Sequence, residues 1–345
     1  MISYQTSAPG APLIEVETKT PEPQGSEVLI KTIACGVCHS DIHMHEGVFD
    51  LGGGKQLEVG REGMVLGHEI FGEVIALGPD AQDAEIGDRR VVFPWIGCGE
   101  CAACKRGDEQ LCTPGCALGI AHAGGFADHV MVPHSRYLFD KGDVMDSLAA
   151  TYACSGLTAY GALKKIGKLH EGDDIVIIGA GGVGMMAIQI ARALGMDPIV
   201  VDIDDDKLEA ARALGVNRSY NSSELQTAKD IRQTTGGAYA ALDFVGAEAS
   251  VSYGLGCLRK GGMLIIVGLY GGSLTLPIPF IPMNARIIQG SYVGGLEDMA
   301  ELMAMVREGK IAPIQITERP LKEANQALID LKAGNVRGRQ VLINA

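Results

Sequence analysis

Positive charge is scarce in this chain of 345 residues: 29 lysines and arginines stand against 42 aspartates and glutamates, a formal net charge of −13. Such a chain would be repelled by nucleic acid and by anionic membrane surfaces, so we expect neither as a partner. A disordered chain is excluded, because 47% of the residues are apolar. At about 100–200 residues per domain, the length predicts two domains.

Two kinds of apolar segment are also missing. The first residues, Met1 to Pro9, have neither the basic region nor the apolar core of a secretory leader. The longest uncharged run, 261–285, contains glycines and prolines that would break a membrane-spanning helix, so it predicts a buried strand followed by a loop. We therefore expect a cytoplasmic protein. In that reducing compartment the nine cysteines are better explained as metal ligands or core thiols than as disulfides.

The pattern of the chain changes near Asp173. Before about Val132, short apolar runs alternate with Gly, Pro and Asp turns, which is typical of an antiparallel β domain. After Asp173, strands alternate with helices, which indicates a parallel sheet covered on both faces. The predicted fold class is therefore α/β plus β. The expected strands are 27–33, 70–76, 90–93, 174–178, 198–202, 241–245 and 263–267, and the expected helices are 182–194, 207–214 and 250–258.

The last 55 residues differ from the alternating region before them. They predict an amphipathic helix over 296–307, a second helix over 321–333 and a closing strand over 340–343. We expect this tail to rejoin the first domain, which would make that domain discontinuous. The predicted boundaries are 1–153 with 291–345 for the β-rich domain and 154–290 for the α/β domain.

A glycine-rich turn, Gly179-Ala-Gly-Gly-Val-Gly184, follows one expected strand and opens a helix, and Asp202 ends the next strand. In a dinucleotide site, Gly179 permits the tight turn, Gly181 lets the pyrophosphate approach the backbone, and Gly184 allows the helix to pack on the strand. The pyrophosphate would lie on the helix N-terminus. The acid at position 202 repels a 2′-phosphate, so NAD is favoured over NADP. A purely structural glycine turn is the alternative.

Four cysteines lie close together in the spacing C-x2-C-x2-C-x7-C: Cys98, Cys101, Cys104 and Cys112. Four thiolates in one short loop can close a tetrahedral shell around a soft divalent ion and leave no position for substrate. This spacing predicts a structural zinc site in a lobe over 94–115. A cluster of reduced thiols without metal is the alternative.

Three further candidate ligands are dispersed: Cys38, His68 and Cys154. Spacing alone does not bring them together, and a lone cysteine is more often a small core residue than a ligand. Together they would supply two thiolates, one imidazole and an open fourth position, the ligand set of a catalytic zinc.

At this point the chain resembles the zinc-dependent medium-chain alcohol dehydrogenases over nearly its whole length. The run Gly36-Val-Cys-His-Ser-Asp41, the triplet Gly67-His-Glu69, the four-cysteine lobe, Cys154-Ser-Gly-Leu-Thr158, the glycine turn and Gly338-Arg-Gln-Val-Leu342 occur in the order of that family. The resemblance implies a GroES-like β-rich catalytic domain with a Rossmann domain. It also implies an enzyme that transfers hydride reversibly from a zinc-bound alcohol to NAD, giving an aldehyde or a ketone.

The resemblance assigns roles around the catalytic metal. It implies that Cys38, His68 and Cys154 bind the catalytic zinc, so that each chain would hold two zinc ions. Glu69 resembles the family's nearby carboxylate, and Asp41 would accept a hydrogen bond from His68. Ser40 and His43 match the family's proton relay, in which a histidine suits the outer end because its unperturbed pKa is about 6.5. Read without the family, His43 would more often be a plain surface histidine.

On the cofactor side, the resemblance implies contacts from three parts of the chain. Asp202 and Lys207 resemble the adenosine-ribose pair, Thr158 a nicotinamide contact and Arg339 the arginine that meets the pyrophosphate. His39 stands where some members carry arginine, which predicts weaker NADH binding and faster release. The remaining expected contacts are Gly182, Val183, Val245, Val267, Leu269 and Val293.

Phe93 and Trp95 fall where the family lines its substrate pocket, which favours apolar aliphatic or aromatic alcohols, primary or secondary, over polyols. The alternative is that both are ordinary core aromatics. The stretch 271–288 resembles the segment through which family members pair their Rossmann sheets, so we expect a homodimer or a homotetramer. Two other functions remain open: a zinc-free quinone or enone reductase of the same fold, and a non-catalytic NAD-binding structural protein.

Overall fold

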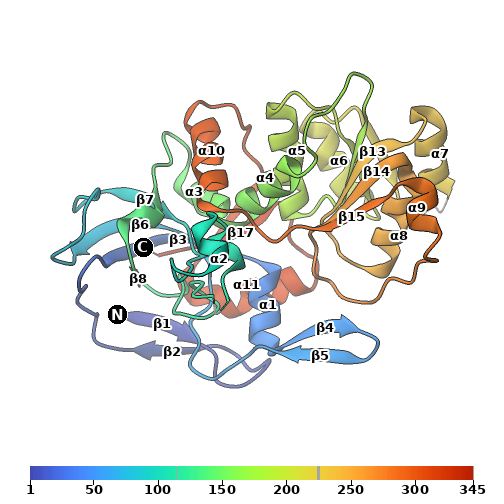
Figure 1. Cartoon of the computed structure of the whole chain (residues 1–345). Helices are drawn as coiled ribbons and strands as arrows, with labels where there is room; N and C mark the ends of the chain where they lie inside the picture. The colour runs from blue at the N-terminus through green and yellow to red at the C-terminus, as the bar shows by residue number, and fades with distance from the viewer. Residues whose placement is uncertain (114, 224–225, 345) are drawn as a thin grey trace. The chain divides into compact units, whose positions relative to one another are not determined.

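The computed structural model describes residues 1–113, 115–223 and 226–344, so residue 114 of the predicted lobe lies outside the described part. The chain divides into two compact units (Figure 1). Unit 1 comprises Met1–Phe49, Glu58–Leu157 and Gly294–Ala345, and unit 2 comprises Asp50–Leu57 and Thr158–Val293. The C-terminal tail thus belongs to the same unit as the N-terminal region. The short segment Asp50–Leu57 is grouped with the α/β unit, an assignment that the sequence did not suggest.

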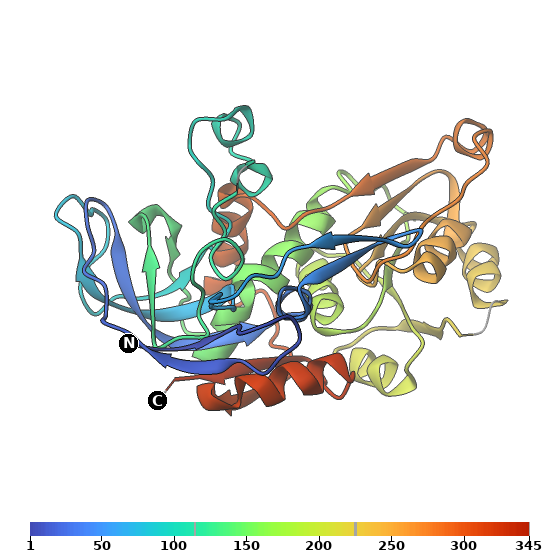
Figure 2. The same cartoon turned by 90° about the horizontal axis from the view of Figure 1, so that it is seen from below.

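Unit 1 is built on a largely antiparallel sheet whose strands run in the order β16-β17-β3-β6-β7-β9, with β8 paired to β3. The long strands β3 and β6 are buried at most positions, and helix α3 packs against both of them. Helix α11 packs against β17 and β3 (Figure 2). The strands are β1 Ile2–Gln5, β2 Ile14–Glu17, β3 Val28–Val37, β6 Glu69–Leu77, β7 Arg89–Val92, β8 His129–Val132, β9 Leu138–Phe139, β16 Ile316–Pro320 and β17 Arg339–Ile343.

The helices of unit 1 are mostly short, and several of them border the candidate site. One of them, η3, is a π-helix that carries Cys154 and runs directly from α3 into α4. The helices are α1 His39–Glu46, α2 Ala102–Lys105, η1 Glu109–Leu111, η2 Ser135–Tyr137, α3 Asp146–Thr151, η3 Tyr152–Gly156, α10 Leu296–Arg307, η4 Leu321–Glu323 and α11 Ala324–Lys332.

Unit 2 is a parallel sheet in the order β12-β11-β10-β13-β14-β15. From β10 the chain adds β11 and β12 on one side and β13, β14 and β15 on the other. Because each crossover between parallel strands is right-handed, the two opposite directions place helices on opposite faces of the sheet. One face is filled by branched side chains of β10, β11 and β14 together with residues of α7 and α8. The strands are β10 Ile175–Ile178, β11 Ile199–Asp202, β12 Arg218–Asn221, β13 Ala238–Asp243, β14 Leu258–Ile266 and β15 Ile287–Gly290.

The helices of unit 2 are α4 Leu157–Lys164, α5 Gly182–Ala193, α6 Asp205–Ala213, α7 Gln226–Thr235, α8 Glu248–Cys257 and α9 Phe280–Asn284. The two remaining strands are β4 Val48–Gly52 and β5 Lys55–Glu58, which pair with one another. The predicted fold class is confirmed, and the predicted strands and helices exist, with ends displaced by up to about five residues. The uncharged run 261–285 contains part of β14 and a connecting segment, but it also holds the short helix α9, which was not predicted.

Candidate active site

Cys38, His68 and Cys154 come together in unit 1: one ligand atom of each lies within 4.8 Å of the others, and all three side chains are buried. Cys38 caps the start of α1, His68 directly precedes β6, and Cys154 lies in the π-helix η3. Glycine is required beside His68, because a Cβ at Gly67 would lie 2.4 Å from the Phe126 ring, and Gly67 has a φ of +90°. The fold therefore joins three ligand types that are far apart in sequence.

The chemistry of this cluster fits a divalent metal. Both ring nitrogens of His68 are buried, and neither makes a hydrogen bond among the residues that the structure describes. A buried polar atom without a partner is rare in proteins, and an imidazole nitrogen facing two thiols is a natural ligand for zinc. Hydrogen bonding with Cys154 and the nearby His68 hold the pKa of the Cys38 thiol well below its ordinary value, against the effect of burial. The same hydrogen bond raises the pKa of the Cys154 thiol, so of the two thiols Cys38 is the one favoured as thiolate, the form that binds metals.

Asp41 connects two of these ligands. Its carboxylate accepts the Cys38 backbone N–H at 2.8 Å and the Gly67 backbone N–H at 3.0 Å, and its Oδ1 lies 3.3 Å from Nδ1 of His68. The side chain is completely buried. A carboxylate this close to Nδ1 favours the proton on that nitrogen, which would leave Nε2 free to bind a metal.

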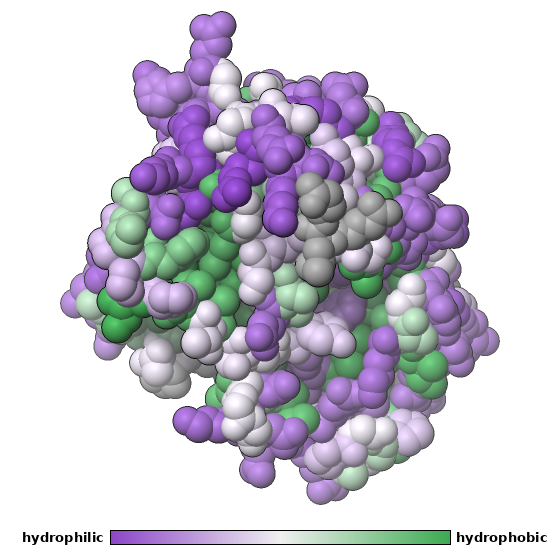
Figure 3. Space-filling view, turned by 90° about the vertical axis from the view of Figure 1, so that its right-hand side faces the viewer, coloured by the Kyte–Doolittle hydropathy of each residue, from purple (hydrophilic) through white to green (hydrophobic). Residues whose placement is uncertain are grey.

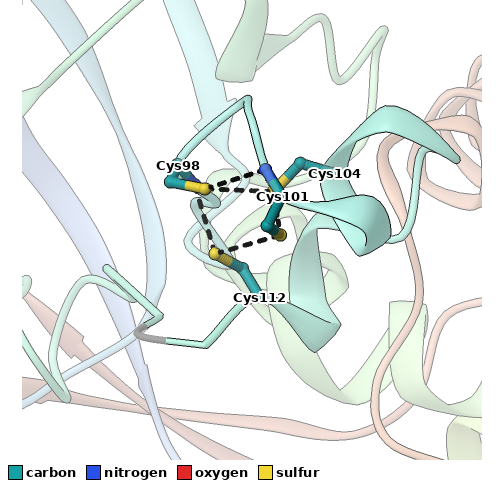
Figure 4. A group of neighbouring side chains, drawn as sticks. All are labelled: Cys98, Cys101, Cys104 and Cys112. Carbon is teal, nitrogen blue, oxygen red and sulfur yellow. Dashed lines mark hydrogen bonds between the residues drawn. The ribbon is translucent and has the colours of Figure 1, made fainter.

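The four-cysteine lobe forms a second cluster in unit 1 (Figure 4). Its sulfur separations include 3.5 Å for Cys101 to Cys104, 3.8 Å for Cys101 to Cys112 and 4.0 Å for Cys98 to Cys104. Zinc bound to four sulfurs at about 2.3 Å places them about 3.8 Å apart in a tetrahedron. Hydrogen bonding from the Cys104 amide lowers the pKa of Cys101 to about 6. The sulfur separations in the lobe are thus close to those of a tetrahedral zinc site.

The glycine turn in unit 2 has the form expected of a phosphate cradle. Gly179 has a φ of +92°, and a Cβ at Gly184 would lie 1.7 Å from the Gly179 carbonyl oxygen, so both positions require glycine. A Cβ at Gly181 would meet nothing within 4 Å, which leaves open space where α5 begins. The open space at the helix N-terminus suits the pyrophosphate of a dinucleotide.

Comparison with known proteins agrees with this geometry. Residues 24–143 match the family model described as the alcohol dehydrogenase GroES-like domain, and residues 182–308 match that described as zinc-binding dehydrogenase. A curated NAD-dependent alcohol dehydrogenase of Sulfurisphaera tokodaii is 39% identical over 345 residues, which covers 97% of each chain. The chain belongs to the zinc-dependent medium-chain alcohol dehydrogenase family. The family and the NAD-dependent alcohol dehydrogenase activity predicted from sequence are thus confirmed.

Solved structures of the family give the same result for the fold. The alcohol dehydrogenase of the hyperthermophilic archaeon Aeropyrum pernix has a TM-score of 0.88 at 29% identity and covers 99% of this chain and 100% of its own. Acetophenone reductase of Geotrichum candidum, solved in complex with NAD, has a TM-score of 0.87 at 29% identity and covers 99% of this chain and 96% of its own. The predicted combination of a GroES-like domain and a Rossmann domain is confirmed.

Arg339, expected to meet the pyrophosphate, is buried in this dehydrogenase and pairs with Glu69. The second oxygen of Glu69 accepts the backbone N–H of Ser155 at 3.0 Å, directly beside the ligand Cys154. Gly36 is required here, since a Cβ would lie 1.9 Å from a Glu69 oxygen. Burial raises the pKa of the Glu69 carboxyl, and Arg339 opposes that rise. Arg339 thus reaches the backbone beside Cys154 through Glu69, an arrangement that the sequence did not indicate.

Asp202 and Lys207 lie at the end of β11 and in α6. Asp202 is 8% exposed, and its carboxylate accepts the Ala180 N–H of the glycine turn at 2.7 Å and the Asp204 N–H at 3.0 Å. Lys207 Nζ lies 3.9 Å from Asp204. Asp202 therefore braces the glycine turn, a function not predicted for it.

The other expected cofactor contacts show a range of exposure. Leu269 is 51% exposed and His39 is exposed, whereas Val293 is buried and has a φ of +40°, which is unusual for a β-branched residue. The partly exposed ones are Gly182, Val183, Thr158, Val245 and Val267.

Ser40 and His43 lie three residues apart on α1, which places them on one side of the helix. The Cys38 sulfur lies 4.0 Å from the Ser40 hydroxyl, and the His43 ring stacks on Phe49 at 4.4 Å. Burial lowers the pKa of His43, partly offset by Glu46 and Cys38. The imidazole is therefore kept neutral to a lower pH than a free histidine.

Phe93 and Trp95, the expected pocket residues, are both buried in the segment after β7. The Phe93 ring stacks on Tyr137, with 6.1 Å between centroids. The Trp95 ring lies 5.4 Å from the His68 ring, centroid to centroid. Trp95 is thus a neighbour of His68, whereas the stacking partner of Phe93 lies in the core.

Sequence reasoning missed Glu109, which is 5% exposed within the lobe. Its carboxylate accepts the Gly97 N–H at 3.1 Å and the Tyr137 hydroxyl at 2.7 Å, and it pairs with Arg136 at 3.0 Å. Gly97 precedes the first cysteine of the lobe, so Glu109 attaches the lobe to the body of unit 1. An acid between two cysteines carries no sequence signal that separates it from an exposed one.

No helix in the described ranges combines the length and the apolar character that crossing a membrane would require.

Proposed function

We propose that this NAD-dependent alcohol dehydrogenase performs its reaction at Cys38, His68 and Cys154, converting an alcohol reversibly to an aldehyde or ketone. The observation that carries the proposal is the buried imidazole of His68, whose ring nitrogens make no hydrogen bond among the described residues and which lies beside two thiols. When bound there, zinc would supply a Lewis acid that lowers the pKa of an alcohol hydroxyl. Three protein ligands leave the fourth position for substrate.

The surrounding residues would hold these ligands in place. Asp41 keeps the His68 proton on Nδ1 and also fixes the backbone beside Cys38 and His68. The Glu69–Arg339 pair supports the backbone beside Cys154. Because Glu69 and Arg339 are both buried, each charge needs its partner, and removing either would leave an uncompensated charge.

Proton removal would use Ser40 and His43. The Ser40 hydroxyl, 4.0 Å from the Cys38 sulfur, is close enough to the ligands to receive the alcohol proton. His43 would accept it in turn as a neutral imidazole, and its lowered pKa favours that neutral form near neutral pH.

NAD would be held by Gly179, Gly181 and Gly184, with Asp202 and Lys207 on the ribose side. The open space at Gly181 and the acidic end of β11 support this assignment. NAD would supply the hydride acceptor. Arg339 is a weaker candidate for the pyrophosphate, because it is buried against Glu69.

A second zinc would occupy the lobe, giving two ions per chain. The sulfur separations near 3.8 Å support this proposal, and four thiolates would leave no position for substrate. That zinc would therefore stabilise the fold and take no part in the reaction.

The substrate would be an apolar alcohol. The Trp95 ring beside His68 supports this, since a large aromatic surface next to the metal excludes a densely hydroxylated substrate. Phe93 supports it less, because its ring stacks on Tyr137.

Homo-oligomers are supported by the edge of the unit 2 sheet. β15 lies at one end of the strand order, and all four of its residues are exposed, including Ile287 and Ile288. Apolar Ile278 and Met283 are also exposed nearby in the sequence, and Figure 3 shows hydrophobic surface gathered on this side of the molecule. An exposed apolar edge strand is a ready site for pairing with a second copy. The cytoplasmic location stays a prediction.

Metal content measured together with NADH formation tests the proposal. We expect two zinc ions per chain and NADH formation with ethanol, longer primary and secondary alcohols or benzylic alcohols. Enone reduction that persists after chelation would instead favour the zinc-free reductase. NAD binding without turnover of any alcohol would favour the structural protein.

A further inference from the structure

Trp95, the single tryptophan of the chain, touches the surroundings of two proposed zinc ligands at once. It is 4% exposed, and its indole N–H donates to the carbonyl oxygen of Ala153 at 3.1 Å. Ala153 immediately precedes Cys154 in η3. The centroid of the same ring lies 5.4 Å from the centroid of the His68 ring, and the two ring planes are tilted by 57°. One rigid side chain thus contacts both the turn that carries Cys154 and the ring of His68.

The conformation of η3 explains why this contact matters. In a regular α-helix the Leu157 N–H would donate to the carbonyl of Ala153, four residues earlier. Here that N–H donates to the carbonyls of Tyr152 and Cys154 instead. Such a widened turn is uncommon and is found mostly at functional positions. The Ala153 residue is buried, and its carbonyl oxygen accepts the indole N–H of Trp95.

We propose that Trp95 is a positioning residue for the catalytic zinc: its indole N–H holds the π-helical turn that presents Cys154, and its ring limits the rotation of His68. The proposal rests on the ligand set given under Proposed function. It differs from a role in lining the substrate pocket, because it makes zinc affinity depend on Trp95 in the absence of any substrate.

Zinc release tests the proposal directly. The purified enzyme is mixed with a chromophoric zinc chelator, and the release of each ion is followed over time. Trp95→Phe keeps an aromatic ring but removes the N–H. We expect it to speed release of the catalytic zinc by about tenfold, as for other groups that orient metal ligands, and to leave the lobe zinc unchanged. Cys38→Ala identifies the catalytic phase, since that phase should be missing.

Phe93→Leu is the matched control. It removes a buried aromatic ring two residues away in the same segment, but that ring stacks on Tyr137 and not on a ligand. Its zinc release should match that of the wild type. A Trp95→Phe variant that releases zinc no faster than wild type or Phe93→Leu would overturn the positioning role alone. If Cys38→Ala removes no zinc phase, the ligand assignment itself is wrong.

A second measurement uses the unaltered protein, so it does not depend on how a variant folds. The single indole N–H gives one resonance in a 15N-labelled sample. Two equilibria are coupled here: zinc binding, and formation of the hydrogen bond from the Trp95 N–H. Because such coupling is reciprocal, if the hydrogen bond strengthens zinc binding, then bound zinc must also protect the Trp95 N–H from solvent exchange. We expect about tenfold slower exchange with zinc than after its removal. Equal exchange rates in the two states would contradict the proposal.

Discussion

The two cysteine clusters of unit 1 reach similar ligand separations by different means. The lobe takes all four sulfurs from 15 consecutive residues, and it is partly exposed. The other cluster draws on residues spread over 117 positions, and every member is buried. The lobe sulfurs are hydrogen-bonded by the backbone of their own loop. In the buried cluster, side chains next to one member reach the backbone beside another: Asp41 near Cys38 reaches Gly67, and Glu69 next to His68 reaches Ser155. A local cluster can be closed and structural, but an open reactive site needs the tertiary fold to hold it.

The largest expected effect separates the two clusters by function. Cys38→Ala should lower alcohol oxidation by several orders of magnitude, because the Lewis acid that lowers the hydroxyl pKa is lost. Metal analysis should then find one zinc per chain, and the unfolding temperature should change little. Retention of both ions together with normal turnover would show that the buried cluster is not the reactive site.

His43→Ala should reduce kcat/KM by about a hundredfold, the lower end for a general acid–base group. The wild-type pH profile should also show where His43 titrates. Proton acceptance requires the neutral imidazole, so the rate falls as pH falls through its pKa. Burial lowers that pKa from 6.5, so the wild-type profile should stay flat to below pH 6.5. An acid limb that starts above 6.5, or persists unchanged in His43→Ala, would contradict the relay.

Cys101→Ser tests the role of the lobe, as Cys38→Ala tests that of the buried cluster. Zinc contributes about 10–16 kcal/mol to small structural sites. Even a loss of about 3 kcal/mol would lower the unfolding temperature of unit 1, which spans roughly 200 residues, by about 6–12 °C. Calorimetry and metal analysis should show that loss together with one zinc ion. Turnover of the remaining folded enzyme should be near normal. A variant that unfolds normally but is inactive would reverse the roles of the two clusters.

The smallest effect concerns the attachment of the lobe. Glu109→Gln removes the charge that Tyr137, Arg136 and the Gly97 N–H share. We expect a cost of about 1.5 kcal/mol, the lower end for hydrogen bonds to a charged group, because Arg136 is 46% exposed. The unfolding temperature should fall by about 3–6 °C, with both zinc ions retained. Tyr137→Phe serves as the matched control and should cost less, since it leaves the carboxylate with its other partners.

The fold was largely predictable where the pattern is local. Strands such as Ile175–Ile178 are continuous buried apolar runs, and the helix Leu296–Arg307 has an apolar stripe with acidic residues in its first turn. The strand Ile287–Gly290 and the helix Gln226–Thr235 were missed: the strand is exposed throughout, and the mean hydropathy of the helix is low. Neither element is a continuous buried apolar run, so neither gives the signal that predicted the strand Ile175–Ile178.

Sequence alone determined the chemistry that is encoded at fixed spacing: the four-cysteine lobe and the glycine turn, whose geometry follows from a few adjacent backbone angles. Only the tertiary structure decided which distant side chains support the buried cluster. It paired Arg339 with Glu69, turned Asp202 toward the glycine turn and placed Trp95 between Ala153 and His68. The physical reason is that a buried charge or polar group must find a partner when the chain folds, and which partner it meets depends on the packing of the whole unit.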